Sequence, residues 1–437
     1  MKFAKSRKLQ KLAHQLMPGG TQSYSKGDDQ FPFLSPPILV KAQGAYIWDA
    51  DGNRFIDWCM GMRSVILGHG YKTVIAAVRK QLPFGTNYNR PSHYEIELAK
   101  MLVELIPSAQ VVKFAKNGSA ATTAAVKLAR AYTKRDLVAM CAGAFNGFDD
   151  WGIASTPMTA GIPKTVLNMT KTFEYNNIVS VRKMFKKYPK KIAAVILEPA
   201  TEVGPVNNFL QEVQRICRQN GTILIFDEMI SGFRWHLKGA QYVYKVTPDL
   251  STFGKAISNG FALAALVGRK DIMELGGMDT KKERVALISA THAGENHALV
   301  AAIATLKELK SKNVPAYVNK LGNLLKSEFN KIARKHGLDS VLSVIGEFGC
   351  RIRVQFEDFG GYTAAQIKTY FAQEMISQGI LFNGYFSPTL SHKKREVAQT
   401  LKGWEFSCRK LKEVLADKSL EKELVGEPIR PVFRKYN

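Results

Sequence analysis

The chain has 437 residues, of which 46% are apolar and 23% charged, a composition typical of a folded globular protein of two or three domains. No apolar run approaches the eighteen or so residues that span a membrane, and the basic start is not followed by a signal-peptide core, so we expect a cytoplasmic protein without a membrane partner. The net charge of +25 indicates either a solvated basic surface or attraction of an anionic substrate. No nucleic-acid-binding motif is present in the sequence, so a nucleic-acid partner is not expected.

The first part of the chain predicts a small antiparallel unit followed by a helix. Turn signals at Gly44 and Gly52 surround two short apolar runs, 45–48 and 55–58, which are typical of a hairpin. Residues 71–82 then carry apolar side chains at helical spacing. We expect residues 1–65 to form an N-terminal segment that packs with a small C-terminal domain.

From about residue 95 to 310, helix and strand patterns alternate. This alternation predicts a large α/β domain, residues 66–313, built on a mostly parallel sheet. After residue 313, helix-like stretches alternate with short strands, which predicts a smaller α+β domain over 314–437. The expected strands of the large domain are 111–114, 137–141, 192–197, 222–226, 250–253 and 262–267.

Two strand ends carry the most informative residues. The run 222–226 ends at Asp227, and a second short run, twenty-eight residues further on, delivers Lys255 after Gly254. A strand-end lysine and a strand-end aspartate suit pyridoxal 5'-phosphate, because the amine can attach to the cofactor and the carboxylate can keep the pyridine nitrogen protonated. The Asp227-Glu228 pair also resembles a Walker B strand, but no phosphate loop precedes it, so an ATPase is not expected.

Two further segments could bind a phosphate. Asn117-Gly118-Ser119 follows a predicted strand and opens an Ala-rich helix, so its first-turn N–H groups can bind an anion, although an ordinary helix cap is the alternative. Thr291 could likewise offer a hydroxyl and an N–H group. His292 and His297 have no third ligand nearby, and the five cysteines are scattered, so no metal site is expected.

Several ordered runs resemble the class III, fold-type I pyridoxal-phosphate aminotransferases, and among them especially glutamate-1-semialdehyde aminomutases. The similarity extends from about residue 18 to 309 and more weakly to 401. The runs that carry it are Pro18–Ser23, Trp48–Asn53, Ile66–His69, Leu128–Thr133, Leu197–Pro199, Asp227–Arg234 and Thr247–Lys255.

The resemblance implies a role for each matching residue. Lys255 and Asp227 match the lysine that holds the cofactor and the acid at its ring nitrogen. Cofactor-binding roles are implied for Asn117, Gly118 and Ser119 at the phosphate, Met229 and Phe145 on the two ring faces, Glu198 beside the ring, and Thr291 at the phosphate of a neighbouring subunit. Such enzymes are homodimers with shared sites, so a homodimer is expected here.

Departures from the family pattern concern the substrate. Lys26 stands where the aminomutase has an arginine, Met62 where it has a tryptophan, and Asn146 follows Phe145 where the family has histidine after tyrosine. With Arg63, these changes suggest transfer of an amino group from a small-molecule donor to an anionic carbonyl acceptor, such as a keto-sugar. An aminomutase-type internal amine shift and an inactive binding or regulatory protein on the same fold remain alternatives.

Overall fold

The computed structural model describes residues 2–436, and the chain divides into two compact units. Unit 1 combines residues 1–71 with 316–432, and unit 2 combines residues 72–315 with 433–437. Among residues 2–436, no helix is both long and apolar enough to cross a membrane.

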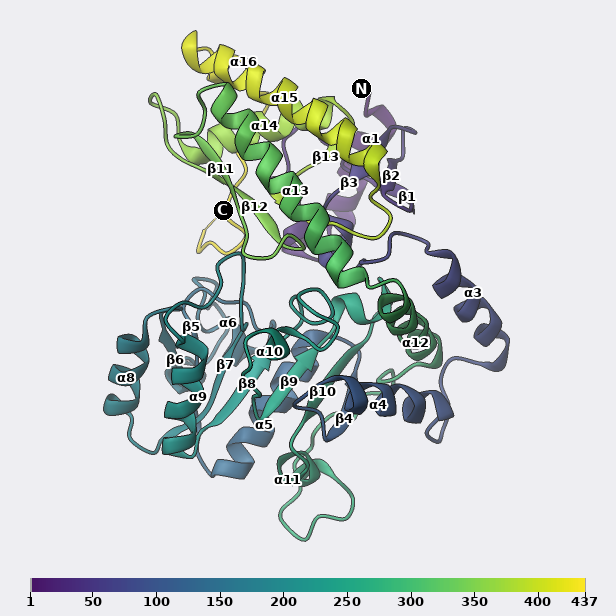
Figure 1. Cartoon of the computed structure of the whole chain (residues 1–437), viewed down its shortest axis with the longest axis vertical. Helices are drawn as coiled ribbons and strands as arrows, with labels where there is room; N and C mark the ends of the chain where they lie inside the picture. Colours follow the sequence, from purple (N-terminus) through teal and green to yellow (C-terminus); the bar gives the residue numbers. More distant parts are fainter. Residues whose placement is uncertain (1, 437) are drawn as a thin grey trace. The chain divides into compact units, whose positions relative to one another are not determined.

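Unit 2 is built on a seven-stranded sheet of order β4-β10-β9-β8-β7-β5-β6 (Figure 1). The neighbouring strands β9, β8, β7, β5 and β6 run parallel, whereas β10 pairs antiparallel with both β9 and β4. The prediction of a mostly parallel sheet in a large α/β unit is therefore confirmed. The strands are β4 (Val111–Ala115), β5 (Leu137–Cys141), β6 (Thr170–Phe173), β7 (Ile192–Leu197), β8 (Ile223–Asp227), β9 (Leu250–Phe253) and β10 (Ala264–Gly268).

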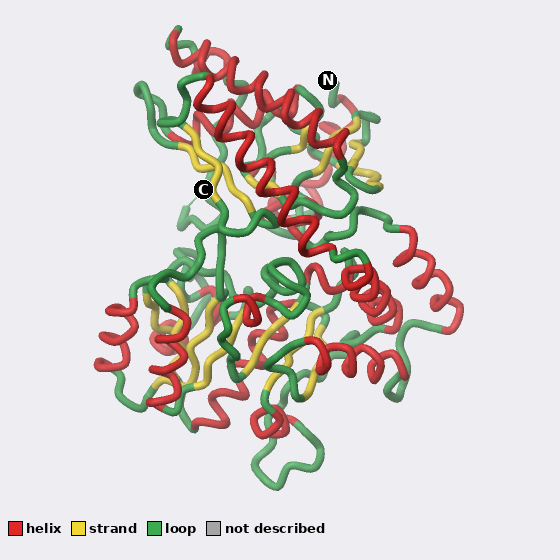
Figure 2. The backbone as a smooth tube through the Cα atoms, in the orientation of Figure 1, coloured by secondary structure: helices red, strands yellow, loops and turns green. Residues whose placement is uncertain are grey.

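Helices cover both faces of this sheet, which explains why its central strands are apolar throughout (Figure 2). Alternate residues of β7 enter different cores: Ala194 and Ile196 pack with α5, whereas Val195 and Leu197 pack with α8 and α9. The helices are α3 (Lys72–Gln81), α4 (His93–Leu105), α5 (Gly118–Thr133), α6 (Asp150–Ile153), α7 (Lys164–Met169), α8 (Ile178–Lys187), α9 (Phe209–Asn220), α10 (Ala240–Val243), α11 (Lys270–Met273) and α12 (Asn296–Ser311).

Unit 1 contains two smaller sheets, of order β1-β2-β3-β13 and β11-β12-β14. Its core is aromatic, with Trp404 stacked on Phe329 at 4.1 Å between ring centroids. Its strands are β1 (Leu39–Gln43), β2 (Tyr46–Asp49), β3 (Arg54–Asp57), β11 (Leu342–Ile345), β12 (Ile352–Phe356), β13 (Ile380–Leu381) and β14 (Tyr385–Phe386). Its helices are α1 (Ala4–Leu16), α2 (Met60–Arg63), α14 (Ala364–Ser377), α15 (Lys394–Ala416), α16 (Leu420–Glu423) and most of α13 (Val314–Lys335).

The short segment α2 has the opposite hand to an ordinary helix. Met60, Gly61, Met62 and Arg63 have φ values of 45°, 56°, 57° and 68°. The surroundings fix this turn, since Asp57 Oδ1 accepts a hydrogen bond from the Met60 N–H (3.0 Å) and the Gly61 carbonyl accepts one from Ser64 Oγ (2.8 Å). Left-handed backbone costs roughly 1–2 kcal/mol per non-glycine residue, so these contacts must hold it in place.

Candidate active site

The carboxyl ends of β8 and β9 place the two most informative residues at one edge of the sheet. The strands are parallel neighbours with Asp227 opposite Thr252, and Lys255 follows β9 by two residues. The positive charge of Lys255 acts to lower the pKa of the Asp227 carboxyl. Lys255 is half-buried and has a φ of 46° at the start of a 3-10 turn. The structure therefore brings the predicted pair together.

Asp227 is a buried carboxylate with three hydrogen-bond donors. Its Oδ2 accepts from Asn146 Nδ2 at 2.8 Å, while its Oδ1 accepts from the Met229 N–H at 3.1 Å and from Thr252 Oγ1 at 3.2 Å. Burial raises the pKa of Asp227, and the Asn146 hydrogen bond and the charge of Lys255 oppose that rise. Because desolvation disfavours the charged form, a cationic partner at this carboxylate would be stabilising.

The N-terminus of α5 lies at the same edge, because β4 leads directly into it and runs parallel to β9. Asn117 caps this helix, its side-chain oxygen accepting from the Ala120 N–H at 2.9 Å. Ser119 is buried, and its Oγ accepts from the Phe148 N–H at 3.1 Å. The turn and the loop that follows β5 are thus joined by hydrogen bonds next to the first N–H groups of the helix.

Met229 connects the strand ends with this turn. Its sulfur lies 3.1 Å from the position a Cβ would take on Gly118 and 2.5 Å from that position on Gly254. A Cβ at Gly254 would require the Met229 side chain to move, whereas a Cβ at Gly118 would require a shift of only a few tenths of an ångström. Asp227, Met229, Gly118 and Lys255 therefore converge from three segments of the chain.

The remaining predicted residues of unit 2 lie in loops, and two of them, Glu198 and Phe145, follow strands that end at this edge. Glu198 follows β7, and its charge is among the influences that raise the pKa of Asp227. Phe145 follows β5 and keeps 49% of its surface exposed. Thr291 is exposed in the loop before α12, and its carbonyl accepts from Asn87 Nδ2 at 2.8 Å. Its predicted role at a neighbouring subunit stays a prediction.

The three predicted substrate residues belong to unit 1. Lys26 ends a 3-10 turn, Tyr24–Lys26, and Met62 and Arg63 lie in the left-handed turn. Met62 is 39% exposed, and the Arg63 guanidinium lies 4.6 Å from the centroid of the Tyr385 ring. Their roles stay predictions.

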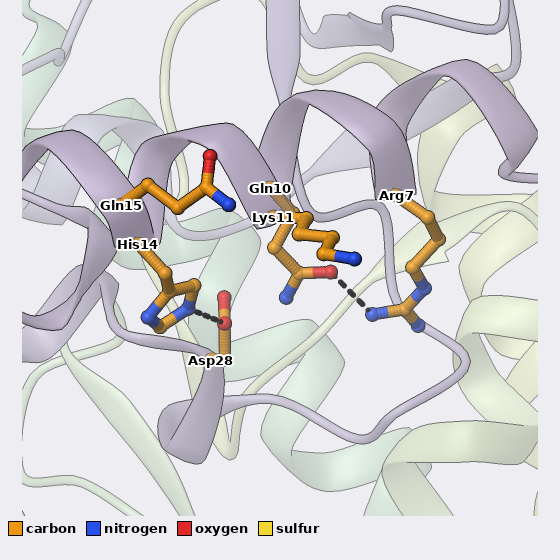
Figure 3. A pocket seen from close by; sticks show the side chains of 6 residues that line it. All are labelled: Arg7, Gln10, Lys11, His14, Gln15 and Asp28. Carbon is orange, nitrogen blue, oxygen red and sulfur yellow. Dashed lines mark hydrogen bonds and ion pairs between the residues drawn. The ribbon is translucent and has the colours of Figure 1, made fainter.

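A surface hollow in unit 1 contains none of the predicted site residues (Figure 3). In it, His14 Nε2 pairs with Asp28 Oδ2 at 2.6 Å, and an Arg7 guanidinium N–H donates to Gln10 Oε1 at 2.8 Å. The side chains that line the hollow are Arg7, Gln10, Lys11, His14, Gln15 and Asp28.

Asn146 and Thr252 were not among the residues predicted for the site. Both are buried and hold the two oxygens of Asp227. Asn146 was visible in the sequence only as a departure from a family pattern, whereas Thr252 could have been found from strand pairing, because it lies opposite Asp227.

Comparisons with known proteins identify the family of the chain. Residues 25–403 match the family model "Aminotransferase class-III". Glutamate-1-semialdehyde 2,1-aminomutase of Sulfurihydrogenibium azorense is 32% identical over 426 residues, covering 92% of this chain and 98% of that protein. An omega-transaminase of Sphaerobacter thermophilus superposes with a TM-score of 0.84 at 26% identity, covering 93% of this chain and 97% of that one.

A second solved structure, the FumI protein of Sphingopyxis sp. MTA144 in its internal aldimine form with pyridoxal 5'-phosphate (PLP), superposes with a TM-score of 0.85 at 26% identity. That alignment covers 95% of this chain and 97% of that one. With strand ends that carry Lys255 and Asp227 beside a capped helix N-terminus, the chain belongs to the class III aminotransferases, enzymes that depend on pyridoxal 5'-phosphate.

Proposed function

We propose that Lys255, Asp227 and the N-terminus of α5 hold the pyridoxal phosphate. The residues fit the group, because the buried Asp227 accepts three hydrogen bonds and gains from a cationic ring nitrogen. The Oδ1 atom of Asn146, whose side chain also binds Asp227, is buried and accepts no hydrogen bond from residues 2–436. It could therefore accept a hydrogen bond from a bound group. The buried strand-end pair of Asp227 and Lys255 is the observation that carries the proposal.

Each residue has a defined task in this proposal. When bound, PLP supplies an electron sink for charge that develops on the substrate carbon. Lys255 Nζ anchors the cofactor and, once released, takes a proton from the α-carbon of the amino donor and later returns one to the acceptor carbon. Asp227, fixed by Asn146 and Thr252, holds a proton at the ring nitrogen.

Other residues complete the proposed site. Met229 and Phe145 lie on the two ring faces, and Glu198 orients the ring. Asn117, Gly118 and Ser119 bind the phosphate through the capped helix N-terminus. Thr291 reaches the phosphate of the second subunit, so the working form is a homodimer with shared sites.

The overall reaction we propose is transfer of an amino group from a donor to a separate carbonyl acceptor. Lys26 and Met62 replace the arginine and tryptophan of the aminomutase pattern, and lysine cannot reproduce the bidentate grip of arginine on a carboxylate. The net charge of +25 and Arg63 favour an anionic acceptor, with a keto-sugar as our first candidate.

An internal amine shift is the second candidate, because the curated relative at 32% identity is an aminomutase. The two reactions differ in what they consume. An aminomutase turns over one substrate without an added acceptor, whereas transamination stops after one half-reaction until a carbonyl compound is supplied. A panel of amino donors tested with and without keto-acids and keto-sugars, including glutamate-1-semialdehyde alone, separates them.

Substitution of the proposed anchor tests the assignment directly. Lys255→Ala should remove the absorbance band of bound cofactor near roughly 410–430 nm and lower turnover by at least about 10³-fold, since both anchoring and proton transfer are lost. The exposed Lys238 lies on the loop beyond β8, and Lys238→Ala should keep both. Turnover retained in Lys255→Ala would contradict the assignment. A wild-type protein that shows no band and takes up no PLP would favour an inactive protein on this fold.

A further inference from the structure

The C-terminal tail reaches the loop that carries Phe145. After α16, residues 424–436 form neither helix nor strand. Near the end of this tail the ring of Phe433 stacks on the ring of Phe145, with 5.6 Å between centroids and 23° between planes. Phe433 is grouped with unit 2, which contains the candidate site.

The main chain just before Phe433 is fixed. The Ile429 N–H donates to Thr369 Oγ1 at 2.8 Å, and the Arg430 N–H donates to the carbonyl of Asp29 at 3.0 Å. Gln30 Nε2 in turn donates to the Arg430 carbonyl at 3.0 Å. These three hydrogen bonds hold the main chain of Ile429 and Arg430 within unit 1.

The loop around Phe145 is held by its main chain but not at the Phe145 side chain. The Asn146 carbonyl accepts from Thr122 Oγ1 at 2.7 Å, and the Phe148 N–H donates to Ser119 Oγ at 3.1 Å. The ring of Phe145 cannot form hydrogen bonds of this kind, and it stays 49% exposed with Phe433 in contact. Stacking is therefore the interaction available to fix its orientation.

We propose that Phe433 is a positioning residue that backs Phe145, so that the open face of the Phe145 ring is presented to the pyridoxal ring. This inference rests on the proposed function, in which Phe145 covers one face of the cofactor. An aromatic ring whose orientation is fixed in advance loses less freedom when a ligand binds, so the tail strengthens cofactor retention without touching the cofactor.

The test measures release of PLP from purified holoenzyme after dilution into a trap for free cofactor, followed by the absorbance and near-ultraviolet circular dichroism of bound PLP. Phe433→Ala should release PLP roughly three to ten times faster, the factor expected for loss of one aromatic pair. Phe433→Tyr keeps the stack and should behave as wild type. Tyr436→Ala removes an aromatic ring that is 77% exposed in the same tail and is the matched control.

The outcomes are separable. Faster release in Phe433→Ala alone, with a weaker dichroic signal that Phe433→Tyr restores, supports the proposal. Equal release from wild type and Phe433→Ala overturns it. Slower release from Phe433→Ala also overturns it, because Phe433 would then compete for the face of Phe145 that the cofactor needs. If the wild-type protein binds no PLP at all, the result contradicts the proposed function rather than the role of Phe433.

Discussion

At the scale of single residues, His392 in unit 1 shows how a buried titratable group is kept neutral. Its ring stacks on Trp58 at 3.8 Å between centroids and 7° between planes. The Thr389 N–H donates to Nδ1 at 3.1 Å, so Nδ1 is the acceptor and Nε2 donates to the Asp57 carbonyl at 3.1 Å. Burial lowers the pKa of His392 to about 4 from its usual 6.5, although Asp57 and Glu396 oppose this and His69 adds to it.

This pKa predicts loss of stability in acid. Below pH 6.5 the unfolded chain binds a proton that the folded chain does not take up until about pH 4, so the free energy of unfolding should fall across this window, by up to about 3 kcal/mol. Urea unfolding followed by tryptophan fluorescence at pH 7 and pH 4.5 measures the loss. His392→Gln should lose less than wild type. An equal loss in wild type and His392→Gln would contradict the argument.

The residues at the candidate site differ in how far the sequence could predict them. Asp227 and Lys255 follow buried apolar runs, so the sequence alone could predict that they lie at strand ends. Asn146 was not, because its hydrogen bond to Asp227 joins positions 81 residues apart and depends on the path of the loop after β5. Phe145 was expected from resemblance alone, and no local pattern indicated its stack on Phe433.

At the scale of elements, two helices of unit 2 begin in the same way. Asn117 caps α5 and Asn177 caps α8, each through a side-chain oxygen that accepts an N–H hydrogen bond, at 2.9 Å and 3.1 Å. Both helices begin at the carboxyl edge of the sheet, but α8 follows the outermost strand β6, whereas Gly118 of α5 lies against Met229 beside Asp227. Comparing variants of Asn117 and Asn177 therefore distinguishes the stability that any helix cap contributes from a role in cofactor binding.

Replacement of either cap should lower stability by about 1 kcal/mol, because one helical N–H group loses its partner. Asn117→Ala should in addition weaken PLP binding several-fold, whereas Asn177→Ala should leave PLP binding unchanged. Thermal unfolding and a PLP titration followed by absorbance measure the two effects. Unchanged PLP affinity in Asn117→Ala would remove this turn from the proposed phosphate site.

Buried elements with regular patterns were predicted best. The strand predicted over 192–197 has the same two ends as β7. The helix α15, with 23 residues, was missed, although buried positions such as Val397, Trp404, Cys408 and Leu411 recur at helical spacing. The antiparallel direction of β10 could not be predicted, since strand direction depends on the connection that follows β9 and not on the strand itself.

At the scale of the whole molecule, the proposed site needs a second copy of the chain. Thr291 is exposed in the loop before α12, as a residue that acts on a neighbouring subunit should be before assembly. Light scattering after size exclusion should therefore give twice the mass of one 437-residue chain at micromolar concentration. Thr291→Ala should weaken PLP binding while the mass stays dimeric. A monomer that binds PLP and is fully active would contradict the shared site.

The left-handed turn from Met60 to Arg63 has a consequence for changing substrate preference. Its backbone path is set by Asp57 and Ser64, which hold main-chain atoms rather than the Met62 side chain. The Met62 side chain can therefore be exchanged while its attachment point stays where it is. Position 62 is thus a suitable place to vary the side chain among residues that tolerate a positive φ, such as Asn, Asp and His, provided that Gly61 is kept, because a Cβ there would lie 2.8 Å from Ser64 Oγ.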